Sequence, residues 1–360
     1  MTTQALGTDL AAMRRLNDNA VLTTLWDADS PVTAAQLAAA TGLSRTTVET
    51  VLTGLVEVDL VDAELLRPTK AGRPARGYSF AADRGVTIGV DVGPHGISGI
   101  AGDLRGATSA PYRRVEGDLS GGEQAATAVV DMVKDLLTES ATPSDDLAAL
   151  SVGIPGIVDA DGKPAKTTVV PDWLTTDIDA HLRQAFPGSR ITFDNDTKLA
   201  ALAETQRGTV GDDETAVLLR VGNRISAASI IDGRVARGAH GAAGEIGALG
   251  RVAWPEARQR FAESFRGGDA DGAAVAAFAG DIADGLGALV LAVDPHVVVV
   301  STSHPDTSLR LAEALHVELS RRALFLPDVR TSPLGPTAPC IGALAVSSSA
   351  AREHLFSREY

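Results

Sequence analysis

The sequence contains very little cysteine. Cys340 is the only one in 360 residues, which excludes an intrachain disulfide framework and any zinc site built from several thiolates. This cysteine usage fits a reducing compartment. We therefore expect a cytoplasmic protein without a structural metal.

Positive charge is also scarce. Lys and Arg number 32 against 46 Asp and Glu, giving a formal net charge of −14. An acidic surface opposes indiscriminate binding to nucleic-acid phosphates or anionic membranes. Any contact with nucleic acid must therefore come from a local basic patch.

Long apolar runs and a signal peptide are missing as well. Acidic Asp9 and mixed polar residues stand where a signal peptide would be basic and then apolar, and the longest apolar stretches stop short of the roughly 20 residues that span a bilayer. We expect no secretion and no membrane partner. With 44% hydrophobic and 22% charged residues the chain is globular, and its length predicts two or three domains.

The first sixty residues carry the spacing of a helix-turn-helix. Apolar residues at three- and four-residue intervals predict a helix over 10–26, and Thr33 and Ser44 are the caps of two further helices around a turn at Gly42. The start of the last helix is the part that reaches base edges in a major groove. The DNA-contacting residues predicted there are Ser44, Arg45, Thr46, Thr47 and Thr50.

A basic segment follows. Between residues 67 and 84 stand five basic side chains and one acidic one, a local charge of +4 inside an acidic chain. Glycine and proline keep the segment slim and extended, which is typical of a wing that enters a minor groove. An ordinary interdomain linker is the alternative interpretation. The contacts predicted in the wing are Lys70, Arg73 and Arg76.

Beyond residue 84, short β-rich runs alternate with Ala-rich helical stretches, as in α/β proteins. Four segments in this part, at 88–93, 151–159, 193–204 and 238–247, resemble in their order and spacing the ROK family, which groups sugar kinases with transcriptional repressors on the actin-like ATPase fold. The helix-turn-helix and the Gly-Arg-Pro stretch are similar to its repressor branch, that of the xylose and N-acetylglucosamine repressors.

The resemblance implies an α/β chain in which a winged helix-turn-helix over 1–80 precedes a two-lobed body. Lobe 1 is expected over 84–200 and lobe 2 over 201–360, with a C-terminal helix that returns to lobe 1. It also implies a sugar site. In ROK kinases an Asn-Asp pair binds a sugar hydroxyl and supplies the base, and a Gly-Glu carboxylate grips neighbouring hydroxyls. The matching positions, with the loop under the sugar, are Gly153, Pro155, Gly156, Asn195, Asp196 and Glu245.

Both polar groups also have purely structural interpretations. Asn195 and Asp196 are suited to capping a helix that begins at Thr197, and Glu245 to an ion pair. A carboxylate and an amide side by side are equally suited to hydroxyl recognition, because the amide donates and accepts together.

Departures from the family's kinase pattern lie in its nucleotide loops. The first loop has Pro94, which offers no amide hydrogen. The second, normally Gly-Thr-Gly-Ile-Gly, reads Gly-Asn-Arg-Ile-Ser over 222–226, so bulkier residues replace glycines that let the backbone approach phosphate. Ser301 begins a Ser-Thr pair where a Gly-Gly is expected. We therefore expect no phosphoryl transfer, no catalytic residues and no nucleotide cofactor.

The family's zinc loop is also altered. Ala248 replaces a histidine that relatives use for zinc and sugar, and residues 249–265 contain no cysteine. We expect no metal, and we expect His95 and His240 to pack or face solvent.

The preferred hypothesis is a repressor that binds a double-stranded operator as a homodimer or higher oligomer and senses a sugar or sugar phosphate. A sugar kinase with atypical nucleotide loops and a dimeric repressor that binds no ligand are the alternatives.

Overall fold

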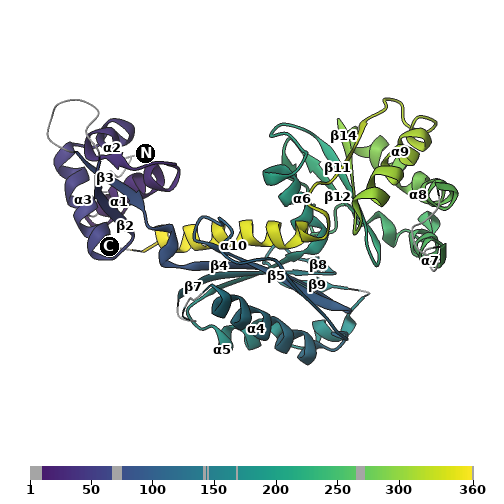
Figure 1. Cartoon of the computed structure of the whole chain (residues 1–360), viewed down its shortest axis with the longest axis horizontal. Helices are drawn as coiled ribbons and strands as arrows, with labels where there is room; N and C mark the ends of the chain where they lie inside the picture. The colour runs from purple at the N-terminus through teal and green to yellow at the C-terminus, as the bar shows by residue number, and fades with distance from the viewer. Residues whose placement is uncertain are drawn as a thin grey trace, which may run out of the picture.

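The computed structural model of the chain describes residues 10–66, 75–140, 143, 146–167, 169–264 and 272–358. Figure 1 shows an N-terminal module, a central lobe and a second lobe in a row, with helix α10 (Ala338–Phe356) lying along the central lobe and reaching towards both neighbours. The predicted α/β class with an N-terminal winged helix-turn-helix is confirmed.

Local sequence signals specify the helices of the N-terminal module. Thr33 caps α2 in a capping box with Gln36, and Gly42 ends that helix in the left-handed region at φ 73°. The Ser44 side chain accepts a hydrogen bond from the Thr47 amide and caps α3. The elements are α1 (Leu10–Trp26), β1 (Val32–Thr33), α2 (Ala34–Thr41), α3 (Arg45–Glu57), β2 (Val61–Leu65) and β3 (Arg76–Phe80).

The central lobe is a five-stranded sheet in the order β10-β7-β4-β5-β6. The strands β10, β7 and β4 are parallel, and β5 and β6 are antiparallel. Helices α4 and α5 cover one face and α10 lies on the other (Figure 1). The elements are β4 (Val86–Gly93), β5 (Gly96–Asp103), β6 (Arg113–Glu116), α4 (Gly122–Glu139), β7 (Leu147–Ile154), β8 (Ile157–Val158), β9 (Pro164–Lys166), α5 (Ile178–Ala185) and β10 (Arg190–Asn195).

The second lobe repeats the arrangement with a sheet in the order β13-β12-β11-β14-β15. Its strands β11, β14 and β15 are parallel, and β12 and β13 are antiparallel. The elements are α6 (Asp196–Arg207), β11 (Ala216–Val221), β12 (Ile225–Ile231), β13 (Arg234–Val235), α7 (Trp254–Ser264), α8 (Gly272–Val293), β14 (Val297–Thr302), α9 (Pro305–Leu319) and β15 (Asp328–Thr331).

We expected no apolar stretch long enough to span a bilayer, and helix α8 departs from that expectation. By length and hydropathy it is the one helix among the described residues that is suited to spanning a membrane. Here its apolar side chains, among them Phe278, Ile282 and Leu286, are buried in the core of the second lobe together with residues of α9 and β14. It is thus the central helix of that lobe.

Candidate functional site

The residues predicted to contact DNA bases lie together at the start of α3. Ser44, Arg45, Thr46 and Thr50 are exposed, and Thr47 is half-buried. The opposite face of α3 is apolar and fully packed into the core of the module. The helix therefore presents a short polar surface that is free to meet a groove.

Two exposed arginines of the N-terminal module, Arg45 and Arg76, contact neighbouring side chains. Arg45 Nε lies 2.9 Å from Glu49 Oε1, one turn further along α3. The guanidinium of Arg76, at the start of β3, lies 5.8 Å from the ring centre of Tyr78. Exposed pairs of this kind are weak, so phosphate can replace them at little cost. The other predicted wing contacts, Lys70 and Arg73, lie outside the described residues.

The predicted sugar-site residues of the central lobe meet at one edge of its sheet. Strands β7 and β10 are parallel neighbours with Asp194 opposite Gly153 and Asn195 opposite Ile154. Their carboxyl ends therefore coincide, and Asn195 Nδ2 donates to the Gly156 carbonyl at 2.9 Å. This places the β7–β8 loop beside the start of α6.

Both glycines of that loop are also required by packing. A Cβ on Gly153 would lie 2.9 Å from Leu199 Cδ1, and one on Gly156 would lie 2.9 Å from the Lys166 carbonyl oxygen. The Pro155 carbonyl accepts a hydrogen bond from Thr167 Oγ1 at 2.8 Å. The loop is thus held rigidly by the strand pair β8–β9.

Asn195 acts as the cap of α6, the structural role that the sequence had allowed for. Its Oδ1 accepts from the amides of Thr197 at 3.1 Å and Lys198 at 3.0 Å. Because Nδ2 uses one hydrogen on Gly156, one amide hydrogen remains for a ligand. Asn195 is therefore a helix cap that still has one donor to offer.

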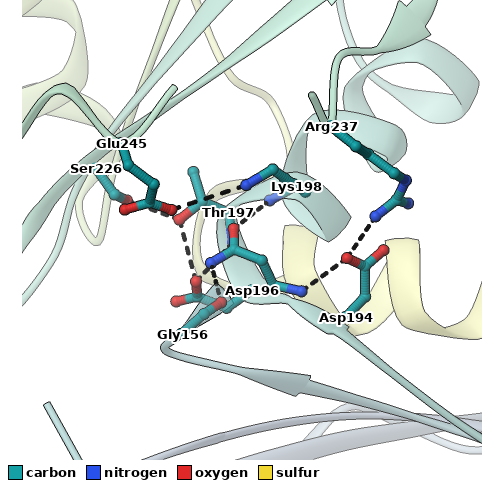
Figure 2. A network of polar contacts seen from close by, with 9 residues as sticks. Gly156, Asp194, Asp196, Thr197, Lys198, Ser226, Arg237 and Glu245 are labelled. Carbon is teal, nitrogen blue, oxygen red and sulfur yellow. Dashed lines mark hydrogen bonds and ion pairs between the residues drawn. The ribbon is translucent and has the colours of Figure 1, made fainter. Parts of the chain in front are cut away.

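Both carboxylate oxygens of Asp196 have partners. Oδ1 accepts from the Thr197 amide at 2.7 Å, and Oδ2 lies 3.3 Å from Arg220 Nη1 on β11. Thr197 Oγ1 in turn lies 2.8 Å from Ser226 Oγ on β12 (Figure 2). The start of α6 is thereby tied to the sheet of the second lobe.

A second carboxylate, Asp91 at the end of β4, completes this charged group. Burial and the charge of Asp196 raise the pKa of Asp91 to about 7, against the opposing effect of Arg220 and Arg114. Asp91 of the central lobe is thus influenced by the charges of Asp196 and of Arg220, which belongs to the second lobe.

Glu245 enters from a loop of the second lobe and meets a buried lysine. Its Oε1 lies 3.7 Å from Nζ of Lys198, whose side chain is only 2% exposed. Burial lowers the pKa of Lys198, and burial likewise raises the pKa of Glu245, although the attraction within the pair opposes both shifts. The ion-pair interpretation of Glu245 therefore describes its contact in this structure.

Three residues of this network escaped the sequence analysis: Lys198, Arg220 and Arg237. Arg237 Nη1 donates to Asp194 Oδ1 at 2.5 Å, and the same oxygen accepts from the Asn195 amide (Figure 2). Their partners lie 24 to 47 positions away in the sequence, and no local pattern reveals such pairs. A basic residue directly after Asn-Asp-Thr was the one available signal.

The loops at the positions of the family's nucleotide elements use their own polar groups internally. The Gly222 carbonyl accepts from Arg258 Nε, and the Gly222 amide donates to the Arg224 carbonyl. The Thr302 amide donates to Ser308 Oγ at 3.1 Å. The amides of Gly222 and Thr302 are thus already hydrogen-bonded within the chain, whereas a phosphate-binding loop leaves its amides open.

Residues 246–264, which follow Glu245, contain neither histidine nor cysteine. His95 and His240 are both exposed, and within the described parts of the chain no three His, Cys, Asp or Glu side chains gather at a common point. The residues present do not fit a zinc ion.

Comparison with known families agrees with this architecture. A family model described as the ROK family matches residues 87–251, and one described as the IclR helix-turn-helix domain matches residues 20–64. The xylose repressor of Bacillus subtilis is 24% identical over 220 residues, which cover 61% of this chain and 56% of that protein. The chain thus spans a little over half the length of that curated relative.

Two solved structures have the same fold. A ROK family transcriptional regulator described as a homologue of the E. coli MLC protein has a TM-score of 0.67 at 15% identity, covering 96% of this chain and 98% of its own. A ROK family glucokinase from Streptomyces griseus, in complex with glucose and AMPPNP, has a TM-score of 0.59 at 20% identity and covers 74% of this chain and all of its own. The regulator match includes the N-terminal module, whereas the kinase match spans only about three quarters of the chain.

Proposed function

We propose that this chain, in which a ROK-family match follows a match to the IclR helix-turn-helix domain, is a sequence-specific DNA-binding repressor of sugar-related genes. The observation that carries the proposal is the exposed polar start of α3, from Ser44 to Thr50, on a helix whose opposite, apolar face is buried in the core of the module. Such a partner places the protein in the cytoplasm.

The charge distribution supports a local DNA contact. The whole chain carries −14, whereas residues 67–84 carry +4, so the wing is the place where phosphates are attracted rather than repelled. We propose a homodimer, because two recognition helices on successive turns of the duplex add their base contacts.

We further propose that a sugar or sugar phosphate binds between the lobes at Asn195, Asp196 and Glu245. Asn195 has one free amide hydrogen, and the Glu245 side chain is 41% exposed. Hydroxyl groups suit such a mixture of donors and carboxylate acceptors. D-xylose is the first candidate because the B. subtilis relative is named as a xylose repressor.

The chain is proposed to lack kinase activity. Asp196, the position of the family's base, contacts a guanidinium instead of standing free, and a base must have an oxygen available to the attacking hydroxyl. Pro94 offers no amide and the Gly222 and Thr302 loops are occupied by Arg258 and Ser308. A phosphate cradle weakened on three sides gives little transition-state stabilisation.

One observation favours the rival, a sugar kinase with atypical loops. Asp91 with a pKa near 7 and Asp196 beside it are a carboxylate pair able to handle a proton at neutral pH. ATP turnover coupled to a sugar panel tests this. Sugar phosphorylation that Asp196→Asn abolishes would establish the kinase.

The repressor proposal is tested on DNA selected from a random duplex library by the full chain. Mobility shift at two salt concentrations should give a selected duplex that binds at least a hundredfold more tightly than unrelated DNA. Equal binding to all duplexes, or none, would contradict the proposal.

Ligand sensing is tested by thermal unfolding with D-xylose, D-glucose, N-acetylglucosamine and their phosphates. A ligand at a hundred times its Kd stabilises the folded protein by about 2.7 kcal/mol. No change with any of them would leave the dimeric repressor without a ligand as the better description.

A further inference from the structure

We propose that α6 and α10 together form a coupling unit that links occupancy of the site between the lobes to the orientation of the N-terminal module. The inference rests on the proposed function, since it concerns how that sugar site and that DNA surface communicate. It is drawn from the contacts that these two helices make at their ends and where they cross.

The two helices cross with their backbones in contact. A Cβ on Gly342 of α10 would lie 1.9 Å from the carbonyl oxygen of Leu199 on α6, so no side chain separates them there. Leu199 lies one turn after the cap Asn195, and the first turn of α6 carries Asp196 and Lys198 of the candidate site. A shift of the start of α6 is therefore transmitted to α10 without a compressible layer between them.

Helix α10 is held equally closely to the central sheet. A Cβ on Gly89 of β4 would lie 2.3 Å from the Leu344 amide and 2.4 Å from the Cys340 carbonyl, both on α10. Helix and sheet thus meet as two backbones, and α10 runs as one continuous rod from the crossing towards the N-terminal module (Figure 1). Displacement at its start is carried to its end rather than absorbed on the way.

The far end of α10 is built into the N-terminal module. Ala351 belongs to the core of that module, and the guanidinium of Arg352 lies 5.6 Å from the ring centre of Trp26 and 5.2 Å from that of Phe356. Trp26 and Phe356 also meet edge to face at 5.8 Å. The end of α10 therefore moves together with α1.

A second set of contacts connects the C-terminal end of α6 to the N-terminal module. Arg207 donates to the Gly106 carbonyl at 2.7 Å, and Gly106 belongs to the turn after β5. In the same turn Arg105 donates to the Leu25 carbonyl of α1 at 2.7 Å, and the Leu104 amide donates to the Ala82 carbonyl at 2.9 Å. Both ends of α6 are thus connected to the N-terminal module.

A ligand that engages Asn195, Asp196 or Lys198 differently in two positions of α6 will accordingly change the angle at which the module presents α3. In a dimer this alters the spacing of two recognition helices and hence operator affinity. Typical couplings between two sites change affinity 5- to 150-fold, and we expect about tenfold.

The experiment uses the full chain, its selected duplex and D-xylose. The duplex Kd with and without 10 mM D-xylose is measured for the wild type, Arg207→Ala and Gly342→Ala. The matched control is Gly280→Ala, a helical glycine of α8 whose Cβ would have no neighbour within 4 Å. Hydrogen exchange of α6 and α10 is measured in parallel with duplex alone.

We expect D-xylose to change the duplex Kd about tenfold in the wild type and in Gly280→Ala, and less than threefold in Arg207→Ala and Gly342→Ala. Duplex binding alone should slow exchange in α6 and α10 of the wild type. Arg207→Ala keeps the test meaningful if Gly342→Ala does not fold.

The coupling unit would be overturned if D-xylose still changed the duplex Kd tenfold in Arg207→Ala. It would also be overturned if duplex binding left hydrogen exchange unchanged in both α6 and α10. Neither result would contradict the proposal that the protein is a repressor. If the wild type binds no selected duplex, the proposed repressor function is contradicted, and so is the coupling unit that rests on it. If no sugar changes the duplex Kd, unchanged exchange would reject the unit and slowed exchange would support it.

Discussion

Arg220 of β11 and Asp196 of α6 form an ion pair, with Nη1 of the arginine 3.3 Å from Oδ2 of the aspartate. Asp91, from the other lobe, lies close enough for the charge of Asp196 to raise its pKa. Asp91 of the central lobe and Arg220 of the second lobe therefore interact electrostatically at this point between the lobes. The electrostatics of this point give the first prediction.

Asp91→Asn should remove a pH dependence of stability. The pKa of Asp91 rises from an ordinary 3.8 in the unfolded chain to about 7 in the folded protein, so the folded state binds the extra proton between these values. The contribution of Asp91 to stability therefore falls as the pH rises from about 4 to about 7, and its removal in the variant should change the pH dependence over this range by up to about 4 kcal/mol. Urea unfolding at pH 4.5, 6 and 8 measures it.

Asp213→Asn, an exposed carboxylate of the second lobe, is the control and should follow the wild-type pH profile. If Asp91→Asn also followed that profile, the raised pKa of Asp91 would be wrong.

The buried pair of Lys198 and Glu245 should respond asymmetrically to substitution. Glu245→Gln leaves the lysine charge buried without its partner and should cost about 1 to 2 kcal/mol, less than for a fully buried pair because Glu245 is 41% exposed. Lys198→Met fills the same space without a charge and should change the free energy of unfolding by under about 1 kcal/mol. Urea unfolding at pH 7 compares them, and a larger loss in Lys198→Met than in Glu245→Gln would contradict the account.

Arg352→Ala should loosen the N-terminal module without unfolding the body. The guanidinium contacts both Trp26 and Phe356, and cation–π contacts are worth about 0.5 to 2 kcal/mol. Because Trp173 and Trp254 are deeply buried, acrylamide quenching of tryptophan fluorescence should report mainly on Trp26 and should increase in the variant. Arg183→Ala, which removes an exposed pair on α5, should quench like the wild type, and equal quenching in both variants would speak against the contact.

Two substitutions should separate phosphate contacts from base contacts. Arg76→Ala should weaken all duplexes alike and reduce the slope of log Kd against log salt concentration by about one. Thr46→Ala should weaken the selected duplex by about tenfold and leave unrelated DNA unchanged.

Mobility shift over a salt series provides both measurements, with Arg251→Ala as an exposed control in the second lobe. An unchanged salt slope in Arg76→Ala would show that β3 does not face the backbone.

The N-terminal module was predictable because its signals are local. The caps at Thr33 and Ser44 and the left-handed Gly42 act within four residues of themselves, so helices expected from spacing agree with those observed to within a residue or two. In the body, strands such as β4 and β7 were found from their apolar runs. That Asn195 and Gly156 belong to one site was implied by the family resemblance.

Helix α10 shows the limit of this approach. Its apolar residues do not gather on one face, because it contacts a sheet, another helix and the N-terminal module along its length, and no amphipathic pattern marked it. The basic partners of Asp196 and Glu245, which are Arg220 and Lys198, could not be predicted either, since each pair joins segments that only folding brings together.

The helix-turn-helix, the α/β class and the chemical types at the candidate sugar site follow from the amino-acid order, because caps, apolar periodicity and motif order are encoded over short distances. Which charges neutralise one another and how the two ends of the molecule are joined became known from the three-dimensional arrangement. Electrostatic pairing and backbone contact, as between Gly342 and Leu199, depend on distances in space that no spacing along the chain specifies.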